Sequence, residues 1–314
     1  MGVHDVETMQ LIRKALDDID PSITIYGEGW SGGQCALAPA LLATKEKVRD
    51  MPGIGAFGNE MRDAIRGSFD NDTKAGWLSG AEGFEESVKF GIVGGIQHPD
   101  VDMEKVNYTD EPWALEPWQH VSYVSCHDDM CLFDRLSNSF PKADAKTIQR
   151  LAMLALTPVL LSQGVPLLFV GEEVLRSKQG VRNSYKSPDV INQIDWGNLM
   201  VHSEYFLYIR ELIHMRRNHR AFRMGSAEMV RSHLHFIHST NNLLAFMIDG
   251  EAVEDSWQTI YVVMNPTGKR QEIFLPHGRY KVVCRNGKIN VNGLSYTRGG
   301  RLLIGKQQAM IVVG

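Results

Sequence analysis

The chain has 314 residues, a length that predicts about two domains. Hydrophobic residues make up 43% and charged residues 22%, an ordinary globular composition that supports a packed core. The formal net charge of −4 leaves no basic excess for a protein whose main task is to bind the phosphate backbone of nucleic acid. No apolar run has transmembrane length. Four cysteines are few for this length, which argues against a disulfide scaffold, and none has zinc-ligand spacing.

The first part of the chain alternates between helical and strand patterns. Helical periodicity predicts helices over 5–18, 143–162 and 203–219, and apolar or β-branched runs predict strands at 23–26, 54–57, 120–125 and 165–170. Asp5 is expected to cap the first helix, and Pro158 is expected to bend or end the long one. The run at 165–170 is apolar throughout, which is typical of a parallel strand buried on both faces.

The pattern changes after about residue 223. Short alternating runs follow one another at 234–238, 243–248, 259–264, 280–284 and 308–313. The pairs Asn286-Gly287 and Asn292-Gly293 are hairpin signals. We therefore predict an α/β domain over 1–222 and an all-β sandwich domain over 223–314.

Acidic residues follow several of the predicted parallel strands. Glu28 comes directly after the first of them, and His127, Asp128 and Asp129 follow the third. In a β/α barrel, the loops at the carboxyl ends of the strands build the active site, so these side chains are expected to converge. Glu172 and Glu173 follow the fourth predicted strand, where a structural role is favoured.

Converging carboxylates beside an aromatic side chain indicate glycoside chemistry. One carboxyl group protonates the leaving oxygen, and a second acts as nucleophile or base. Trp30 would supply the aromatic wall beside Glu28. Each residue alone has a simpler interpretation: Glu28 as a loop acid, and His127 with Asp128 as a local hydrogen-bonded pair. Asp129 could bind substrate or face solvent.

At these residues the chain resembles a known family. The matching segments are 1–9, Tyr26-Gly27-Glu28-Gly29-Trp30, Tyr123-Val124-Ser125-Cys126-His127-Asp128, and a run from Gly171-Glu172-Glu173 through Arg176, Lys178, Gly180, Asn183-Ser184-Tyr185, Asp189 and Asn192 to Asp195-Trp196. They resemble the α-amylase superfamily, glycoside hydrolase family 13, and within it the type I pullulanases, which are α-1,6 debranching enzymes. The long last run distinguishes this subgroup, and the resemblance covers nearly the whole chain.

The resemblance implies roles for individual residues. Glu28 would be the general acid/base, and Asp128 would stabilise the oxocarbenium-like transition state. His127 would hydrogen-bond the same sugar ring, and Trp30 would be an aromatic platform. The remaining substrate-binding candidates are Asp129, Asn183, Tyr185 and Asp189. No metal ligand set and no cofactor follow from the sequence, and the compartment stays open.

Two departures from the family pattern bear on activity. Asp129 stands where the family usually has asparagine, and its charge could raise the pKa of Asp128 or weaken sugar binding. The family's nucleophilic aspartate precedes a Met-Gly pair, and this chain begins at that pair. We therefore expect strands five to eight of a (β/α)₈ barrel, the C-terminal half, followed by the β-sandwich domain.

Such a chain would lack the nucleophile and is expected to be inactive alone. Its expected partners are an α-glucan, the N-terminal half of its own barrel, and further copies paired through open barrel edges. Nucleic acid and membranes are not expected partners. The alternatives left open are an α-glucanotransferase or neopullulanase-type α-1,4 hydrolase, and a non-catalytic α-glucan-binding protein.

Overall fold

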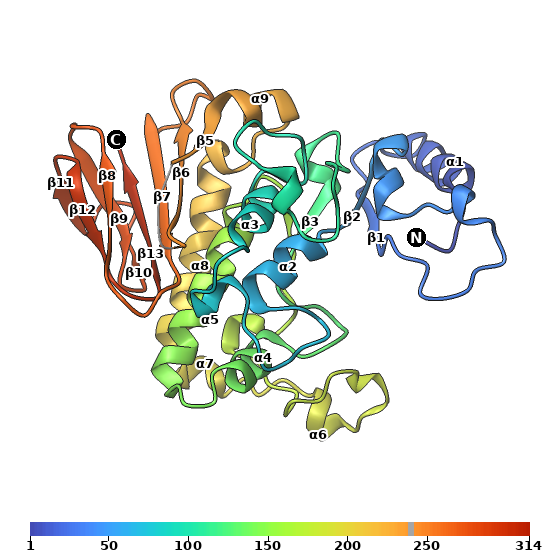
Figure 1. The fold of residues 1–314 in the computed structure, drawn as a ribbon, viewed down its shortest axis with the longest axis horizontal. Coiled ribbons are helices and arrows are strands. Elements are labelled where there is room, and N and C mark those ends of the chain that lie inside the picture. Colours follow the sequence, from blue (N-terminus) through green and yellow to red (C-terminus); the bar gives the residue numbers. More distant parts are fainter. Residues whose placement is uncertain (238–241) are drawn as a thin grey trace.

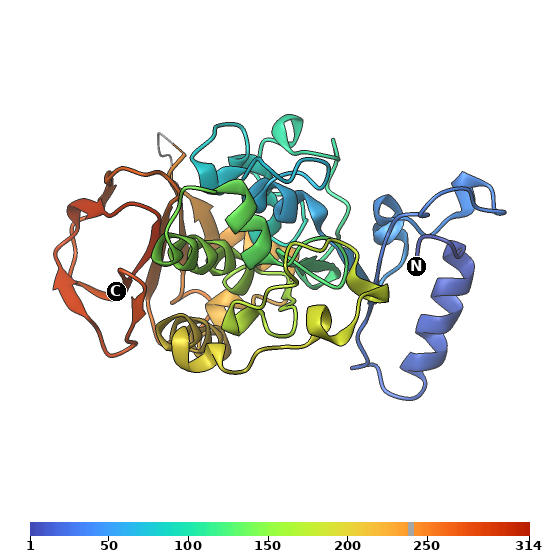
Figure 2. The same cartoon turned by 90° about the horizontal axis from the view of Figure 1, so that it is seen from below.

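The computed structural model describes residues 1–237 and 242–314. Figure 1 shows three parts in a row: a lobe with α1 and β1, a central α/β body, and a β domain that holds the C-terminus. Figure 2 shows the same order from below, with α1 standing apart from the body. Within the described residues, every helix is too short or too polar to span a bilayer.

The N-terminal lobe begins with the predicted helix. Helix α1 spans Val6–Asp17, and the Asp5 carboxylate accepts a hydrogen bond of 2.7 Å from the Thr8 backbone N–H, which caps the first turn. The Arg13 side chain is buried, and its Nη1 donates to the Ile23 carbonyl oxygen at 2.5 Å. This contact ties the helix to the segment that leads into β1.

A four-stranded parallel sheet forms the centre of the first part. Its order is β1-β2-β3-β4, with bounds Ile25–Gly27, Ile54–Phe57, His120–Ser122 and Val165–Pro166. All three neighbouring pairs are parallel. Among the described residues, β1 and β4 are therefore the two edges of this sheet.

The prediction of a fully buried strand at 165–170 is wrong. Only Val165 and Pro166 belong to the ladder, and both are half-buried. Proline has no N–H to donate, and β4 has no strand on its outer side in the described chain. The Leu167 N–H still donates to the Ser122 carbonyl at 2.8 Å, after which the chain leaves the sheet.

Helices cover the sheet and contact the β domain. The remaining α-helices are α2 Asn59–Arg66, α3 Glu85–Ile92, α4 Leu132–Ser139, α5 Ala145–Leu160, α6 Asp189–Asn192, α7 Asn198–Val201, α8 Ser203–Asn218 and α9 Ala227–His233. Short 3₁₀ turns include Glu172–Val174 and Ser184–Lys186. Helix α5 continues for two residues past Pro158, as the prediction of a bend or an end near this residue allows.

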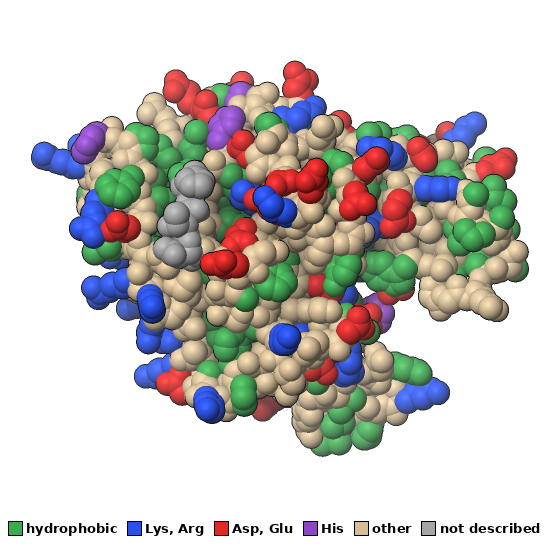
Figure 3. All heavy atoms as spheres, viewed as in Figure 1, with side chains coloured by type: hydrophobic (Ala, Val, Ile, Leu, Met, Phe, Trp, Pro, Cys, Tyr) green, Lys and Arg blue, Asp and Glu red, His purple; other side chains and the backbone are tan. Residues whose placement is uncertain are grey.

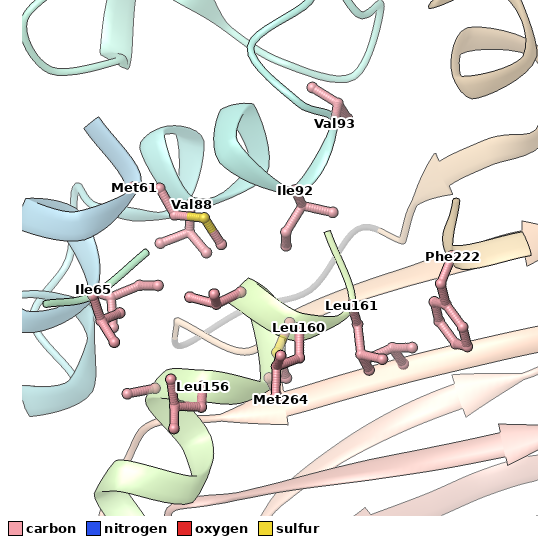
Figure 4. Close-up of a cluster of buried hydrophobic side chains, with 14 of the residues drawn as sticks. Met61, Ile65, Val88, Ile92, Val93, Leu156, Leu160, Leu161, Phe222 and Met264 are labelled. Carbon is pink, nitrogen blue, oxygen red and sulfur yellow. The ribbon is translucent and has the colours of Figure 1, made fainter. Parts of the chain in front are cut away.

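One large core joins the two parts. Figure 4 shows Met61 of α2, Ile92 of α3, Leu160 of α5 and Met264 of the β domain in one cluster of buried hydrophobic side chains. All four side chains are fully buried. The α/β body and the β domain therefore share apolar burial.

The C-terminal part is all-β and antiparallel, as predicted. Its strands are β5 Leu234–Phe236, β6 Leu244–Asp249, β7 Thr259–Asn265, β8 Gln271–Leu275, β9 Tyr280–Arg285, β10 Lys288–Ile289, β11 Ser295–Thr297, β12 Gly300–Ile304 and β13 Gln308–Val313. A seven-stranded sheet has the order β10-β9-β13-β7-β6-β5 with β11 beside β9, and β8 pairs with β12 separately. Apolar side chains of both sheets form a second core.

Two details of the β prediction can be compared with the structure. Asn286 and Gly287 both have positive φ, 54° and 70°, and link β9 to β10 as the predicted hairpin turn. His238, which the sequence pattern placed in the first run, lies outside the described residues. Helix α9 was not predicted, and the division between residues 222 and 223 stays a prediction.

Candidate active site

Three side chains meet at the edge of the parallel sheet. Glu28 follows β1, and His127 and Asp128 come after β3. The His127 Nε2 lies 3.4 Å from the Glu28 Oε1, and their side chains are 70% and 42% exposed. One polar atom from each of the three residues lies within 4.8 Å of the others. The structure thus brings together two acidic groups and an imidazole, all accessible from solvent.

Close backbone packing fixes the position of Glu28. The Gly2 N–H donates to the Glu28 carbonyl oxygen at 2.9 Å, and the Lys45 N–H donates to the Gly29 carbonyl at 2.8 Å. A Cβ at Gly29 would lie 2.7 Å from the Lys45 backbone nitrogen, so only glycine fits there. Trp30 follows at once and is 36% exposed. Gly29 is therefore required by the close approach of the Lys45 backbone.

The Cys126 thiol is hydrogen-bonded to the carboxylate of Asp128. The Cys126 Sγ donates a hydrogen bond of 2.8 Å to the Asp128 Oδ1. Burial raises the pKa of the Cys126 thiol to about 12, so the sulfur keeps its proton at neutral pH. Sequence reasoning treated Cys126 only as a buried thiol and missed this contact, although its place between Ser125 and His127 in the motif was a signal.

Arg62 is another residue that sequence reasoning missed. It lies in the first turns of α2, directly after β2, and its Nη1 donates to the Tyr123 hydroxyl at 3.0 Å. Burial acts to lower the pKa of Arg62, but the neighbouring Tyr123, Asp63 and Asp128 outweigh it and raise that pKa. A fixed positive charge therefore lies behind the carboxylate of Asp128.

Asp129 is placed differently from the other candidates. Its side chain is fully buried, with Oδ2 2.7 Å from the Arg66 Nη2 and Oδ1 2.9 Å from the Arg182 Nε. Burial acts to raise the pKa of Asp129, but the two arginines hold it below its usual value. Each carboxylate oxygen is paired with one guanidinium group, and no part of the side chain is exposed to solvent. The two guanidinium groups balance the extra charge that the sequence placed beside Asp128.

The other candidates lie on the long loop that follows β4. Asn183 is exposed, and its Oδ1 accepts a hydrogen bond of 3.5 Å from the Asp129 N–H, which places it beside the loop after β3. Tyr185 is 80% exposed. Asp189 is exposed at the start of α6. The structure connects Asn183 to the His127-Asp128-Asp129 segment and gives no direct contact for Tyr185 or Asp189 with Glu28.

Two polar residues anchor this loop. Asp134 of α4 accepts hydrogen bonds from the Ser177 hydroxyl at 2.6 Å, the Lys178 N–H at 2.7 Å and the Gly180 N–H at 3.1 Å. The Asn192 Nδ2 donates to the Ser184 carbonyl at 2.8 Å. The Asn192 contact closes the loop within the quoted motif, whereas the Asp134 contacts join residues more than 40 positions apart, which no motif reveals.

The surface is indented near this region. Figure 3 shows a notch between the N-terminal lobe on the right and the lower projection that carries α6. In the described residues, Glu28, His127 and Asp128 also form the group whose polar atoms are close enough to hold a metal ion. No property of these residues selects a metal over a sugar hydroxyl network, and we assign no metal to them.

Comparison with known proteins identifies the family. The sequence profile described as "Pullulanase, all-beta domain" matches residues 230–288. The pullulanase of Bacillus subtilis (strain 168) is 31% identical over 285 residues, which cover 90% of this chain and 38% of that protein. The chain thus spans well under half the length of this relative.

Solved structures agree along the whole chain. The pullulanase from Bacillus acidopullulyticus superposes with a TM-score of 0.91 at 31% identity, covering 99% of this chain and 36% of that one. The Paenibacillus barengoltzii pullulanase, solved in complex with maltohexaose and alpha-cyclodextrin, gives a TM-score of 0.88 at 35% identity and covers 100% of this chain and 46% of that one. In sequence and in fold, the chain is a homologue of the pullulanase-type debranching enzymes of glycoside hydrolase family 13 and corresponds to part of their length.

Proposed function

We propose that this chain provides catalytic groups of a retaining glycoside hydrolase that cleaves α-1,6 branch linkages of pullulan, glycogen or starch oligosaccharides. The observation that supports it is the meeting of Glu28 with His127 and Asp128 at the edge of the parallel sheet. The homologous Paenibacillus barengoltzii pullulanase was solved with maltohexaose, which supports an α-glucan as the ligand.

Each residue of the cluster has a role in this proposal. Glu28 protonates the glycosidic oxygen and later accepts a proton from water. Asp128, held by the Cys126 thiol, interacts with the sugar in the oxocarbenium-like transition state, and His127 donates to the same ring. Trp30 is an apolar wall, and Asn183, Tyr185 and Asp189 contact sugars beyond the cleaved bond. Asp129 positions the loops through its arginines and does not touch the sugar.

The distance between the carboxylates bears on the mechanism. Retaining enzymes hold their two reacting carboxyl groups about 5 Å apart, and inverting ones roughly 6.5–9.5 Å. Glu28 and Asp128 have oxygens within 4.8 Å of each other, but Asp128 is the stabilising group in this proposal, so the retaining class rests on the homology to pullulanases and not on this distance. No third carboxylate of the described residues joins this close group. With Asp128 as the stabilising group, we propose that the 314 residues alone do not complete the covalent step.

Binding and turnover test the proposal separately. Isothermal titration with maltohexaose should show binding, weakened about tenfold or more by Glu28→Gln or Asp128→Asn, because each removes a charge-assisted hydrogen bond. Asp110→Asn is the matched control, since Asp110 is exposed and takes part in no hydrogen bond or ion pair in the described chain. Equal affinity in all variants would refute the assignment of this site.

Turnover on pullulan is measured from reducing ends and product size. We expect none from the chain alone. Turnover abolished by both Glu28→Gln and Asp128→Asn would show that the expected inactivity of the isolated chain is wrong. In a complete enzyme, maltotriose as the sole product supports α-1,6 cleavage, and panose supports the neopullulanase alternative. Binding without turnover in the complete enzyme would favour a glucan-binding protein.

The edges of the parallel sheet support a proposal about partners. β1 and β4 each present one unpaired side in the described residues, and unpaired strand edges are templates for further strands. We propose that these edges pair with the other half of a (β/α)₈ barrel or with a second copy. Light scattering that finds a strictly monomeric, well-folded chain would count against pairing between copies.

A further inference from the structure

The charge of the chain is strongly divided. Residues 259–314 carry nine Lys and Arg side chains and a single acidic one, Glu272, for a local net charge of +8. The whole chain has −4, so residues 1–258 carry −12. Figure 3 shows Lys and Arg side chains gathered over the β domain, on the left, with few acidic ones among them. Such asymmetry between two parts of a chain indicates an anionic partner for the basic part.

Most of these cations have no ion-pair partner among the described residues. Within the described residues, Arg301 forms an ion pair with Glu272, and the other eight Lys and Arg of this part form none. Unpaired exposed cations raise the local positive potential, and that potential repels the compact state. Their concentration on a single domain is therefore unexplained by folding stability.

A hollow lies inside this basic surface. A cavity of about 800 Å³ is lined by His277, Gly278, Arg279, Tyr296, Thr297 and Arg298, which we name the β8–β9 cup. It joins the turn after β8 to the edge strand β11 and the turn that follows it. Its lining contains no carboxylate. A ligand in the cup would meet two guanidinium groups and an aromatic ring.

The cup is built on constrained backbone. The Gly278 N–H donates to the Arg298 carbonyl at 3.0 Å, which joins the two turns. Gly299 has a φ of 73°, and a Cβ there would lie 2.0 Å from the Pro276 carbonyl oxygen. The two turns are therefore held at a short separation that no other residue at Gly299 would permit. The arginine side chains start from fixed positions.

Its aromatic residue is presented to solvent. Tyr296 is 64% exposed, and the Arg279 Cζ lies 5.6 Å from the centre of its ring. In the β11–β9 pair Tyr296 is directly opposite Lys281, so a third cation shares its face of the sheet. An exposed tyrosine ring offers a flat apolar surface to the C–H groups of a pyranose. Guanidinium groups bind phosphate with two parallel hydrogen bonds.

We propose that the β8–β9 cup is an accessory binding site for an α-glucan that carries phosphate monoesters. A sugar ring stacks on Tyr296, and phosphate groups on neighbouring rings pair with Arg279 and Arg298. The glucan part of this ligand rests on the proposed function, and the anionic part rests on the charges of the β domain. Such a site would hold the polymer near the Glu28 cluster and raise its effective concentration there.

The test compares one polymer in two forms. Phosphorylated amylopectin, and the same preparation after phosphatase treatment, are cast into native gels, and retardation of the chain is measured in 20 mM and 300 mM NaCl. We expect tighter binding to the phosphorylated form, with the difference reduced at high salt because screening shortens the reach of exposed charges. Equal retardation by both forms at low salt would overturn the proposal.

Variants locate the site. Arg279→Gln with Arg298→Gln should weaken binding to the phosphorylated form about tenfold, the effect of two modest exposed contacts, and leave the dephosphorylated form unchanged. Tyr296→Ala should weaken binding to both forms. Lys142→Gln with Arg231→Gln is the matched control, since both residues are exposed and form no contact in the described chain. If the control variant bound phosphorylated amylopectin as weakly as the Arg279→Gln, Arg298→Gln variant, the cup would be refuted as the binding site.

Two further measurements separate the alternatives. Glu28→Gln should leave the phosphate-dependent part of binding intact, so failure of the proposed catalytic site and failure of the cup are distinguishable. Retardation or pelleting with a single-stranded oligonucleotide or with anionic phospholipid vesicles provides the comparison with other polyanions. Tighter binding to either of these than to phosphorylated amylopectin would overturn the assignment of a glucan.

Discussion

Replacement of Asp129 by asparagine tests the description of the site most directly. Asparagine is the usual residue at this position in the family that the sequence resembles, so the change is chemically mild. The structure nevertheless predicts a large loss in the free energy of unfolding. Asp129 is fully buried between Arg66, whose side chain is 1% exposed, and Arg182, whose side chain is 36% exposed. Removing the carboxylate charge leaves the Arg66 guanidinium buried without a counter-charge.

The magnitude follows from the burial of each partner. Breaking a buried ion pair costs about 3–5 kcal/mol because one charge stays desolvated. The amide oxygen of asparagine can still accept one hydrogen bond, and Arg182 is partly solvated, so we expect the low end, about 3 kcal/mol. Urea unfolding at pH 7, followed by both circular dichroism and tryptophan fluorescence, measures the free energy of unfolding.

The pH dependence gives a second readout. The folded-state pKa of Asp129 is lowered, so its contribution to stability is present above its usual value of 3.8 and is lost as the pH falls through the folded-state pKa. The difference between wild type and variant should therefore be constant from pH 5 to 8 and shrink in more acidic solution. Asp110→Asn should stay within about 0.5 kcal/mol of wild type. A cost for Asp129→Asn below 1 kcal/mol, or a gain, would refute the buried ion pair.

Three further outcomes are expected. Asp134→Ala should make the chain more sensitive to limited proteolysis at 177–180, since three hydrogen bonds to that loop are lost; an unchanged cleavage map would contradict this. Burial raises the pKa of Glu172 from 4.5 to about 7, so stability falls as the pH rises from about 4.5 to 7 and is constant above that range. Glu172→Gln should raise Tm at pH 8 relative to wild type and change it little at pH 5. Iodoacetamide should alkylate Cys126 more slowly than the partly exposed Cys35, with the difference abolished in urea.

The elements that sequence reasoning found are those with local causes. Helix α1 followed from its apolar period and from Asp5, whose cap lies three residues from its partner. The turn at Asn286 and Gly287 followed from two residues that accept positive φ. The residues that determine these two elements lie within a few positions of one another, so the elements can be predicted without the tertiary fold.

The elements that were missed depend on distant neighbours. Strand β8 carries Phe274 on its solvent side, 65% exposed, so apolar alternation fails there, and its partner β12 begins 25 residues after β8 ends. Strand β4 was predicted too long because a run of apolar residues cannot show where the sheet has its edge. An apolar run indicates that side chains are buried, but it does not show whether the backbone pairs with a neighbouring strand, because that depends on which distant segments pack beside it.

The same limit applies inside the candidate site. Glu28 and the His127-Asp128 pair were found because strand ends and motifs mark them. The partners that decide their behaviour lie far away in the sequence: Arg66 and Arg182 are 63 and 53 residues from Asp129. Without these partners, Asp129 reads as an exposed substrate ligand. With them, it is a buried connection between α2 and the loop after β4.

The net charge of the chain is a further case in which a ligand class cannot be judged from the sequence without knowing where the charges lie. A net charge of −4 argued against binding of the nucleic-acid phosphate backbone as the main task, and that argument is valid for a uniform surface. At physiological ionic strength, however, the field of an exposed charge extends only about 8 Å, so a ligand at the β domain does not sense the acidic residues of the α/β body. The cations beside the cup, Arg279, Arg298 and Lys281, are what such a ligand meets, in a part of the chain whose charge is +8. Composition therefore excludes a class of ligand only for a domain whose own charge has been counted, and here the two parts of one chain give opposite answers.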